Sequence, residues 1–73
     1  PANKNVQIVW NGNQKQNIYI DLIDLSGRII DHKEFESHKN LNINWTISHL
    51  ETGYYFFQFK TEGGLVTKSF VKN

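Results

Sequence analysis

Residues 18–30, which read IYIDLIDLSGRII, decide the fold of this chain. Ile18, Ile20 and Leu22 alternate with a tyrosine and an aspartate, and this period of two is typical of a β-strand with one buried face. The run is rich in β-branched residues and contains no proline, which favours a place in the interior of a sheet. We therefore expect a central strand here.

A turn signal follows directly in the segment DLSGR, residues 24–28. Asp24 can cap its own backbone at the first position of a type I turn, and Gly27 can adopt the left-handed conformation that a bulged hairpin needs. Ile29 and Ile30 then resume the apolar pattern. The segment predicts a tight β-hairpin.

Working outward from this hairpin, short apolar alternations predict strands on both sides. They cover residues 6–10, 17–23, 29–35, 41–45, 54–60 and 65–71. Turns or loops are expected at Asn11-Gly12, at residues 36–40 and at Glu62-Gly63-Gly64. Ser48 and Glu51 have the spacing of a capping box, which allows a single helical turn. The pattern predicts an all-β fold, a small antiparallel β-sandwich of about six to seven strands.

Composition limits the function classes. The 73 residues have room for one domain, predicted to cover residues 1–73, and the formal charge of +1 gives no sign of nucleic-acid binding. There is no cysteine, so neither a disulfide framework nor a thiolate metal site is available. No apolar run is long enough to cross a bilayer. Because the chain begins at Pro1 with no methionine or signal peptide, we expect a piece of a larger protein.

No pattern in the sequence predicts catalysis. His32, His38 and His49 lack metal-ligand spacing, and we expect them to be solvated. Glu34 and Glu36 lie at strand period, but paired carboxylates would need a cleft to act as acid and base. The serines carry no nucleophile motif. The sequence therefore predicts no enzyme, no metal and no cofactor.

Aromatic residues leave a carbohydrate-binding or adhesive module open as an alternative, since exposed aromatic faces stack on sugars. Trp10 and Trp45 are in phase with the apolar residues of their strands, which favours core packing. Tyr19 and Tyr54 fall on the opposite faces and are expected to be exposed. The alternative therefore depends on the tyrosines.

Lysines cluster towards the C-terminal strands, at Lys60, Lys68 and Lys72. A charged edge strand that blocks unwanted pairing is one interpretation, and a recognition surface is the other. The pattern of charge alone leaves both open.

The order of motifs resembles the C-terminal sorting domain, type A, of the type IX secretion system of certain Gram-negative bacteria. The resemblance covers essentially the whole chain. It rests on PAN followed by Val6 and Ile8, on the central hairpin, on LETGYYF at residues 50–56 and on TEGGLVTKSFVK at residues 61–72.

The resemblance implies an immunoglobulin-like sandwich at the end of a secreted cargo protein. Such a domain directs its N-terminal cargo through the periplasm and across the outer membrane, to the cell surface or the medium. Its partners would be the outer-membrane translocon, shuttle proteins and a sortase-like cysteine protease that removes it. Neither nucleic acid nor a small-molecule substrate is implied.

We expect recognition to involve the C-terminal hairpin, because a short hairpin with an accessible last strand can bind through backbone pairing and a few side chains. The predicted contacts are Tyr54, Tyr55, Gly63, Gly64, Lys68, Phe70 and Lys72, with the two lysines on the solvent face. Asp24, Gly27 and Arg28 are expected to shape the fold, with Arg28 able to pair with a carboxylate.

Overall fold

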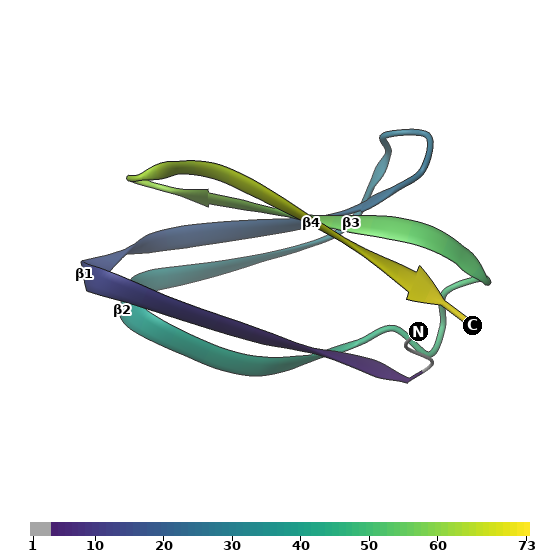
Figure 1. Ribbon diagram of the computed structural model, residues 1–73, viewed down its shortest axis with the longest axis horizontal. Coiled ribbons are helices and arrows are strands. Elements are labelled where there is room, and N and C mark those ends of the chain that lie inside the picture. Colours follow the sequence, from purple (N-terminus) through teal and green to yellow (C-terminus); the bar gives the residue numbers. More distant parts are fainter. Residues whose placement is uncertain (1–3) are drawn as a thin grey trace.

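A computed structural model describes residues 4–73 as one antiparallel sheet of four strands in the order β2-β1-β3-β4 (Figure 1). The strands are β1 (Asn5–Asp24), β2 (Ile29–Thr46), β3 (Gly53–Thr61) and β4 (Gly64–Lys72). The predicted all-β fold is confirmed, and the run at residues 18–22 lies in an interior strand, as its composition predicts. The PAN entry segment lies outside the described residues.

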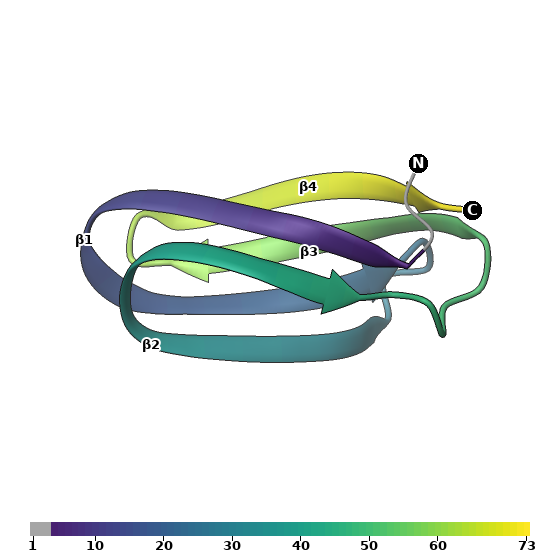
Figure 2. The same ribbon diagram turned by 90° about the horizontal axis from the view of Figure 1, so that it is seen from below.

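The two long strands bend back on themselves. In Figure 2, β1 and β2 run to one end of the molecule, turn there together and return, so the two halves of their hairpin face each other. Pairing continues through this bend, but β1 has residues 12–15 between Asn11↔Asn40 and Gln16↔His38, where β2 has only Lys39. Such an excess of residues in one strand is a bulge, and bulges bend a sheet.

This bend explains why the structure has four strands and not the predicted six to seven. Asn11-Gly12 and residues 36–40, predicted as a turn and a loop, lie within β1 and β2. Ser37 accommodates the change of direction in a left-handed conformation, with φ of 55°, and its N–H donates to Asn17 Oδ1 at 3.2 Å. At residues 47–53 there is a β-turn instead of a helical turn, closed by the Leu50 N–H donating to the Ile47 carbonyl at 3.0 Å.

The core lies between the two folded halves. Ile18, Ile20 and Leu22 are 0% exposed, which confirms the predicted buried face. Trp45, from the returning half of β2, is 1% exposed, and its ring centroid lies 5.0 Å from that of Phe57 on β3. The expected core role of Trp45 is therefore confirmed. The other buried hydrophobic residues of this cluster are Ile8, Leu41, Ile47, Tyr55 and Phe59.

The predicted hairpin turn at residues 24–28 is confirmed in detail. The Gly27 N–H donates to the Asp24 carbonyl at 3.0 Å, and Gly27 has φ of 92°. Asp24 Oδ1 accepts the N–H groups of Ser26 and Arg28, each at 3.0 Å, and Oδ2 lies 3.0 Å from Arg28 Nε. The hydrogen bonds from Ser26 and then from Arg28 hold the pKa of Asp24 below its usual value. Arg28 therefore does pair with a carboxylate, that of its own turn.

Candidate recognition surface

The C-terminal hairpin of β3 and β4 forms one end of the sheet. Its register runs without a shift from Thr61↔Gly64 to Gly53↔Lys72, and β4 has no neighbour on its other side among the described strands. Gly64 sits beside the two-residue turn with φ of 128°, a conformation that glycine adopts without strain. The predicted second tight hairpin is confirmed.

Two of the predicted contact residues face the core. Tyr55 is 8% exposed and donates its hydroxyl to the Glu51 carbonyl at 2.6 Å. Phe70, its register partner, is half-buried and stacks on Tyr55 and Phe57 with centroid distances of 5.5 and 5.1 Å. These contacts give both aromatic residues a packing role.

Other predicted contacts are exposed. Tyr54 is 60% exposed, and Lys68, Gly63 and Gly64 are exposed as well. Tyr54 alternates with Tyr55 along β3, so its side chain lies on the opposite face of the sheet. These residues are accessible to a partner.

Lys72 differs from the prediction. It is 7% exposed and its Nζ donates to the Asn73 carbonyl at 2.8 Å, so its expected position on the solvent face is wrong. Its register partner is Gly53, which has no side chain and therefore leaves room for the lysine stem to lie along the sheet. Of the two terminal lysines, only Lys68 is exposed.

A charged row that the sequence interpretation missed crosses the outer face of the sheet. Asp21 on β1 is 6% exposed; its Oδ1 lies 2.5 Å from His32 Nδ1, and its Oδ2 lies 3.7 Å from Lys60 Nζ. His32 Nε2 lies 2.7 Å from Glu34 Oε2. The hydrogen bond with Asp21, followed by that with Glu34, raises the pKa of His32. His32 is exposed on a strand face, as expected, and it also joins two carboxylates, which the sequence interpretation did not predict.

Turn chemistry alone does not place this row. Counting back from the Ile23↔Ile29 pair would bring residue 21 opposite residue 31, and only the register shift between Leu22 and Ile23 brings it opposite His32.

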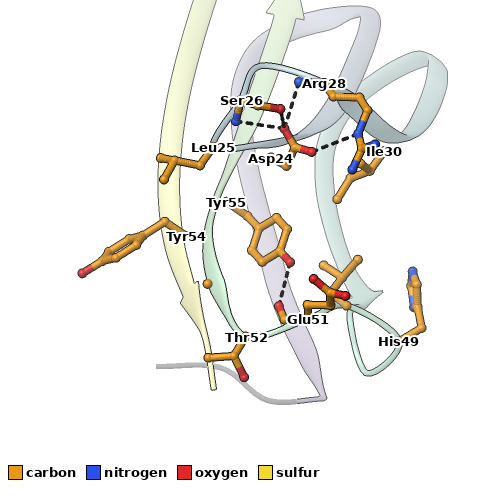
Figure 3. A pocket seen from close by; sticks show the side chains of 12 residues that line it. Asp24, Leu25, Ser26, Arg28, Ile30, His49, Glu51, Thr52, Tyr54 and Tyr55 are labelled. Carbon is orange, nitrogen blue, oxygen red and sulfur yellow. Dashed lines mark hydrogen bonds and ion pairs between the residues drawn. The ribbon is translucent and has the colours of Figure 1, made fainter.

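A hollow of about 630 Å³ lies between the turn at residues 24–28 and residues 49–53 (Figure 3). Figure 3 shows Asp24 occupied by its bonds to Ser26 and Arg28, and Tyr54 pointing away from Tyr55. Because Asp24 already accepts several donors and has a lowered pKa, it is unsuited to act as a general base near neutral pH. The carboxylate of Asp24 therefore serves the turn at residues 24–28.

Residues 4–73 contain neither a metal-binding cluster nor a membrane-spanning helix. The side chains there contain no group of three or more His, Asp or Glu residues placed to hold a metal ion. That part of the chain also contains no helix of the length and hydropathy that a membrane span requires.

Comparison with known proteins gives one match. The family model described as a secretion system C-terminal sorting domain matches residues 1–73. No curated protein and no solved structure matches this chain. The match extends over the whole chain and includes the central hairpin, the Tyr54 strand and the β3–β4 hairpin described above. This chain belongs to the family of type IX secretion C-terminal sorting domains.

Proposed function

We propose that the export machinery recognises this sorting domain through the β3–β4 hairpin. Membership of the family makes the chain a C-terminal sorting signal for type IX secretion, whose cargo goes to the cell surface or the extracellular space. The observation that supports the hairpin as the recognised element is its position: β4 is an edge strand that remains exposed from Gly64 to Ser69.

The other edge of the sheet is less suited to recognition. β2 is interrupted by register shifts, and its first half carries exposed charges of both signs between Lys33 and Lys39. Bulges and charges are the features by which natural sheets protect an edge from pairing. β4 pairs with β3 without a register shift and contains no acidic residue. This contrast favours β4.

The finer steps of the pathway are part of the proposal. The cargo lies N-terminal to the domain, passes through the periplasm, and is delivered by shuttle proteins to the outer-membrane translocon. A sortase-like cysteine protease then removes the domain, which has no catalytic role of its own. The folding of β1 and β2 over the β3–β4 layer is compatible with the immunoglobulin-like sandwich that the resemblance implies.

The test is an export assay with a cargo protein fused in front of the domain. Lys68→Ala and Tyr54→Ala remove exposed side chains of the hairpin, so both variants should fold and leave the cargo in the periplasm. Lys39→Ala is the matched control, because Lys39 is an exposed lysine on the opposite edge strand. Deleting the whole domain tests the sorting function itself.

One outcome would separate the two claims: the folded Lys68→Ala and Tyr54→Ala variants deliver the cargo normally, while deletion of the domain abolishes delivery. That result would support the sorting function and refute recognition through the hairpin surface. Lys72 is unsuitable for this test because its burial would confound recognition with stability.

A carbohydrate-binding function is the second candidate. Tyr54 and Tyr19, 60% and 37% exposed, are on the outer face, as that interpretation requires. The two tryptophans are poorly placed to stack on a sugar. Trp45 is buried, and the ring of Trp10 stacks on that of Phe59 with a centroid distance of 6.0 Å.

A further inference from the structure

We propose that β4 binds an extended segment of a partner protein as an additional strand, and that this segment carries an acidic residue opposite Lys68. This inference rests on the proposed recognition through the β3–β4 hairpin and adds the chemistry of the partner. It follows from three properties of β4: its free backbone edge, its unneutralised charge and its poor fit to a second copy of itself.

The free edge of β4 is defined by the register. A two-residue hairpin closes on a hydrogen-bonded pair, here Thr61↔Gly64, and such pairs then alternate with pairs that are not hydrogen-bonded. The backbone groups of every second residue of β4 therefore point away from β3, and these residues are Leu65, Thr67, Ser69 and Val71. β4 has no proline among its residues, so each of them offers an N–H and a carbonyl to another strand.

The charge on this edge comes from Lys68. Lys60 lies 3.7 Å from Asp21, and Lys72 is turned in towards Asn73. Lys68 takes part in none of the ion pairs found among residues 4–73, and neither β3 nor β4 contains an acidic residue. Opposite charges on directly facing strand residues stabilise pairing. A partner strand with a carboxylate opposite Lys68 would therefore complement the charge of this edge.

A second copy of the chain is a poor occupant. In a symmetric antiparallel pair that uses the whole of β4, Leu65 would face Val71 and Thr67 would face Ser69. Lys68 would then lie opposite its own copy. That pair is not hydrogen-bonded, and its Cα atoms approach to about 4.5 Å, where like charges are destabilising. The edge therefore disfavours self-association and selects a different strand.

Apolar side chains flank the lysine. Val66, on the same side of the strand as Lys68, is 39% exposed, and Leu65 on the opposite side is 57% exposed. A bound strand with β-branched residues on both sides of its acidic residue would cover them. The partner segment is thus expected to be extended, apolar in alternation and acidic at its centre.

The binding test uses nine-residue peptides of alternating valine and threonine with glutamate or lysine at the centre, added to the 73-residue chain. The glutamate peptide should bind about three- to tenfold more tightly and slow amide exchange at Thr67 and Ser69. The Lys68→Glu variant should reverse the preference. Equal binding of the two peptides, protection of β2 instead of β4, or dimerisation of the chain through β4 would each overturn the proposal.

The export assay separates this inference from the proposed function. Thr67→Pro removes one N–H from the free edge, a position where a strand tolerates proline, whereas Thr67→Ala changes only the side chain. Both variants should keep a cooperative unfolding transition. Loss of export with proline but not with alanine is the expected result. If the folded proline variant is exported while Lys68→Ala is not, the hairpin is recognised without strand addition and this inference fails alone.

Discussion

Replacing Gly27 by alanine should destabilise the domain through backbone strain alone. Gly27 has φ of 92°, and a Cβ built on it meets no heavy atom within 4 Å. Steric contact with neighbouring residues therefore adds nothing to the cost. A left-handed conformation costs a residue with a Cβ about 1–2 kcal/mol in the folded state. Alanine also lowers the conformational entropy of the unfolded chain relative to glycine, and this stabilises the folded state by about 0.4–1 kcal/mol.

The net loss of unfolding free energy is therefore about 1 kcal/mol. In a domain of this size, a loss of that amount lowers the thermal midpoint by roughly 4–8 °C. It is a large fraction of a total stability of about 3–5 kcal/mol. Gly27→Val should lose more, because a β-branched residue is rarer still at positive φ, and Gly27→Asn should lose less. The measurement is thermal unfolding followed by circular dichroism.

Gly63→Ala is the matched control in the other hairpin turn. Gly63 has no positive φ, and the nearest atom to its added Cβ is the Thr61 Oγ1 at 3.7 Å, an ordinary contact. This variant should be unchanged or slightly more stable, since only the unfolded chain is affected. If Gly27→Ala is as stable as Gly63→Ala, the reasoning from backbone strain is refuted.

Three further predictions concern His32, Trp45 and Tyr54. The folded chain raises the pKa of His32 above its unfolded value, so its stabilising contribution is complete below about pH 6.5 and is lost as the pH rises through the raised pKa. The unfolding midpoint of the parent chain should therefore fall as the pH rises through this range, and the control variant His49→Gln should show the same fall. A similar fall in His32→Gln would contradict the assignment of this pH dependence to His32. Trp45→Ala should remove about 3–5 kcal/mol of unfolding free energy and give the circular dichroism spectrum of an unfolded chain. Trp45→Phe should stay folded, although it loses the 2.9 Å hydrogen bond to Asp31. Equal losses of stability in the two variants would argue against cavity formation as the cause. Tryptophan fluorescence should not respond to a glycan panel, and a saturable response abolished by Tyr54→Ala would favour the carbohydrate-binding alternative.

Local chemistry made the central hairpin predictable. The alternation at residues 18–22 and the Asp24 and Gly27 positions depend only on neighbours in the chain, and the structure has the expected buried face and turn. The face of Tyr55, Phe57 and Phe59 was predictable for the same reason. The membership of the sorting-domain family, which the order of the motifs indicated, also needed no tertiary information.

Predicting the number of strands and the charged row would have required knowing how two strands pair with each other. Polar residues 12–16 and 36–40 look like separate loops, but they lie opposite one another and bend together, so pairing survives the change of direction. Asp21 and His32 belong to different arms of the hairpin, and only their register brings them within hydrogen-bond distance. Periodicity in one strand contains no such information.

The sequence by itself determined the all-β class, the two tight hairpins and the family, because each depends on side-chain period, turn chemistry or motif order along the chain. Tertiary structure alone decided which polar residues are exposed. Lys68 and Lys72 have the same strand period, yet Lys68 faces Phe57 and remains exposed while Lys72 faces Gly53 and is buried. The burial of a side chain depends on the residue across the sheet, and that residue is fixed only when the strands pair.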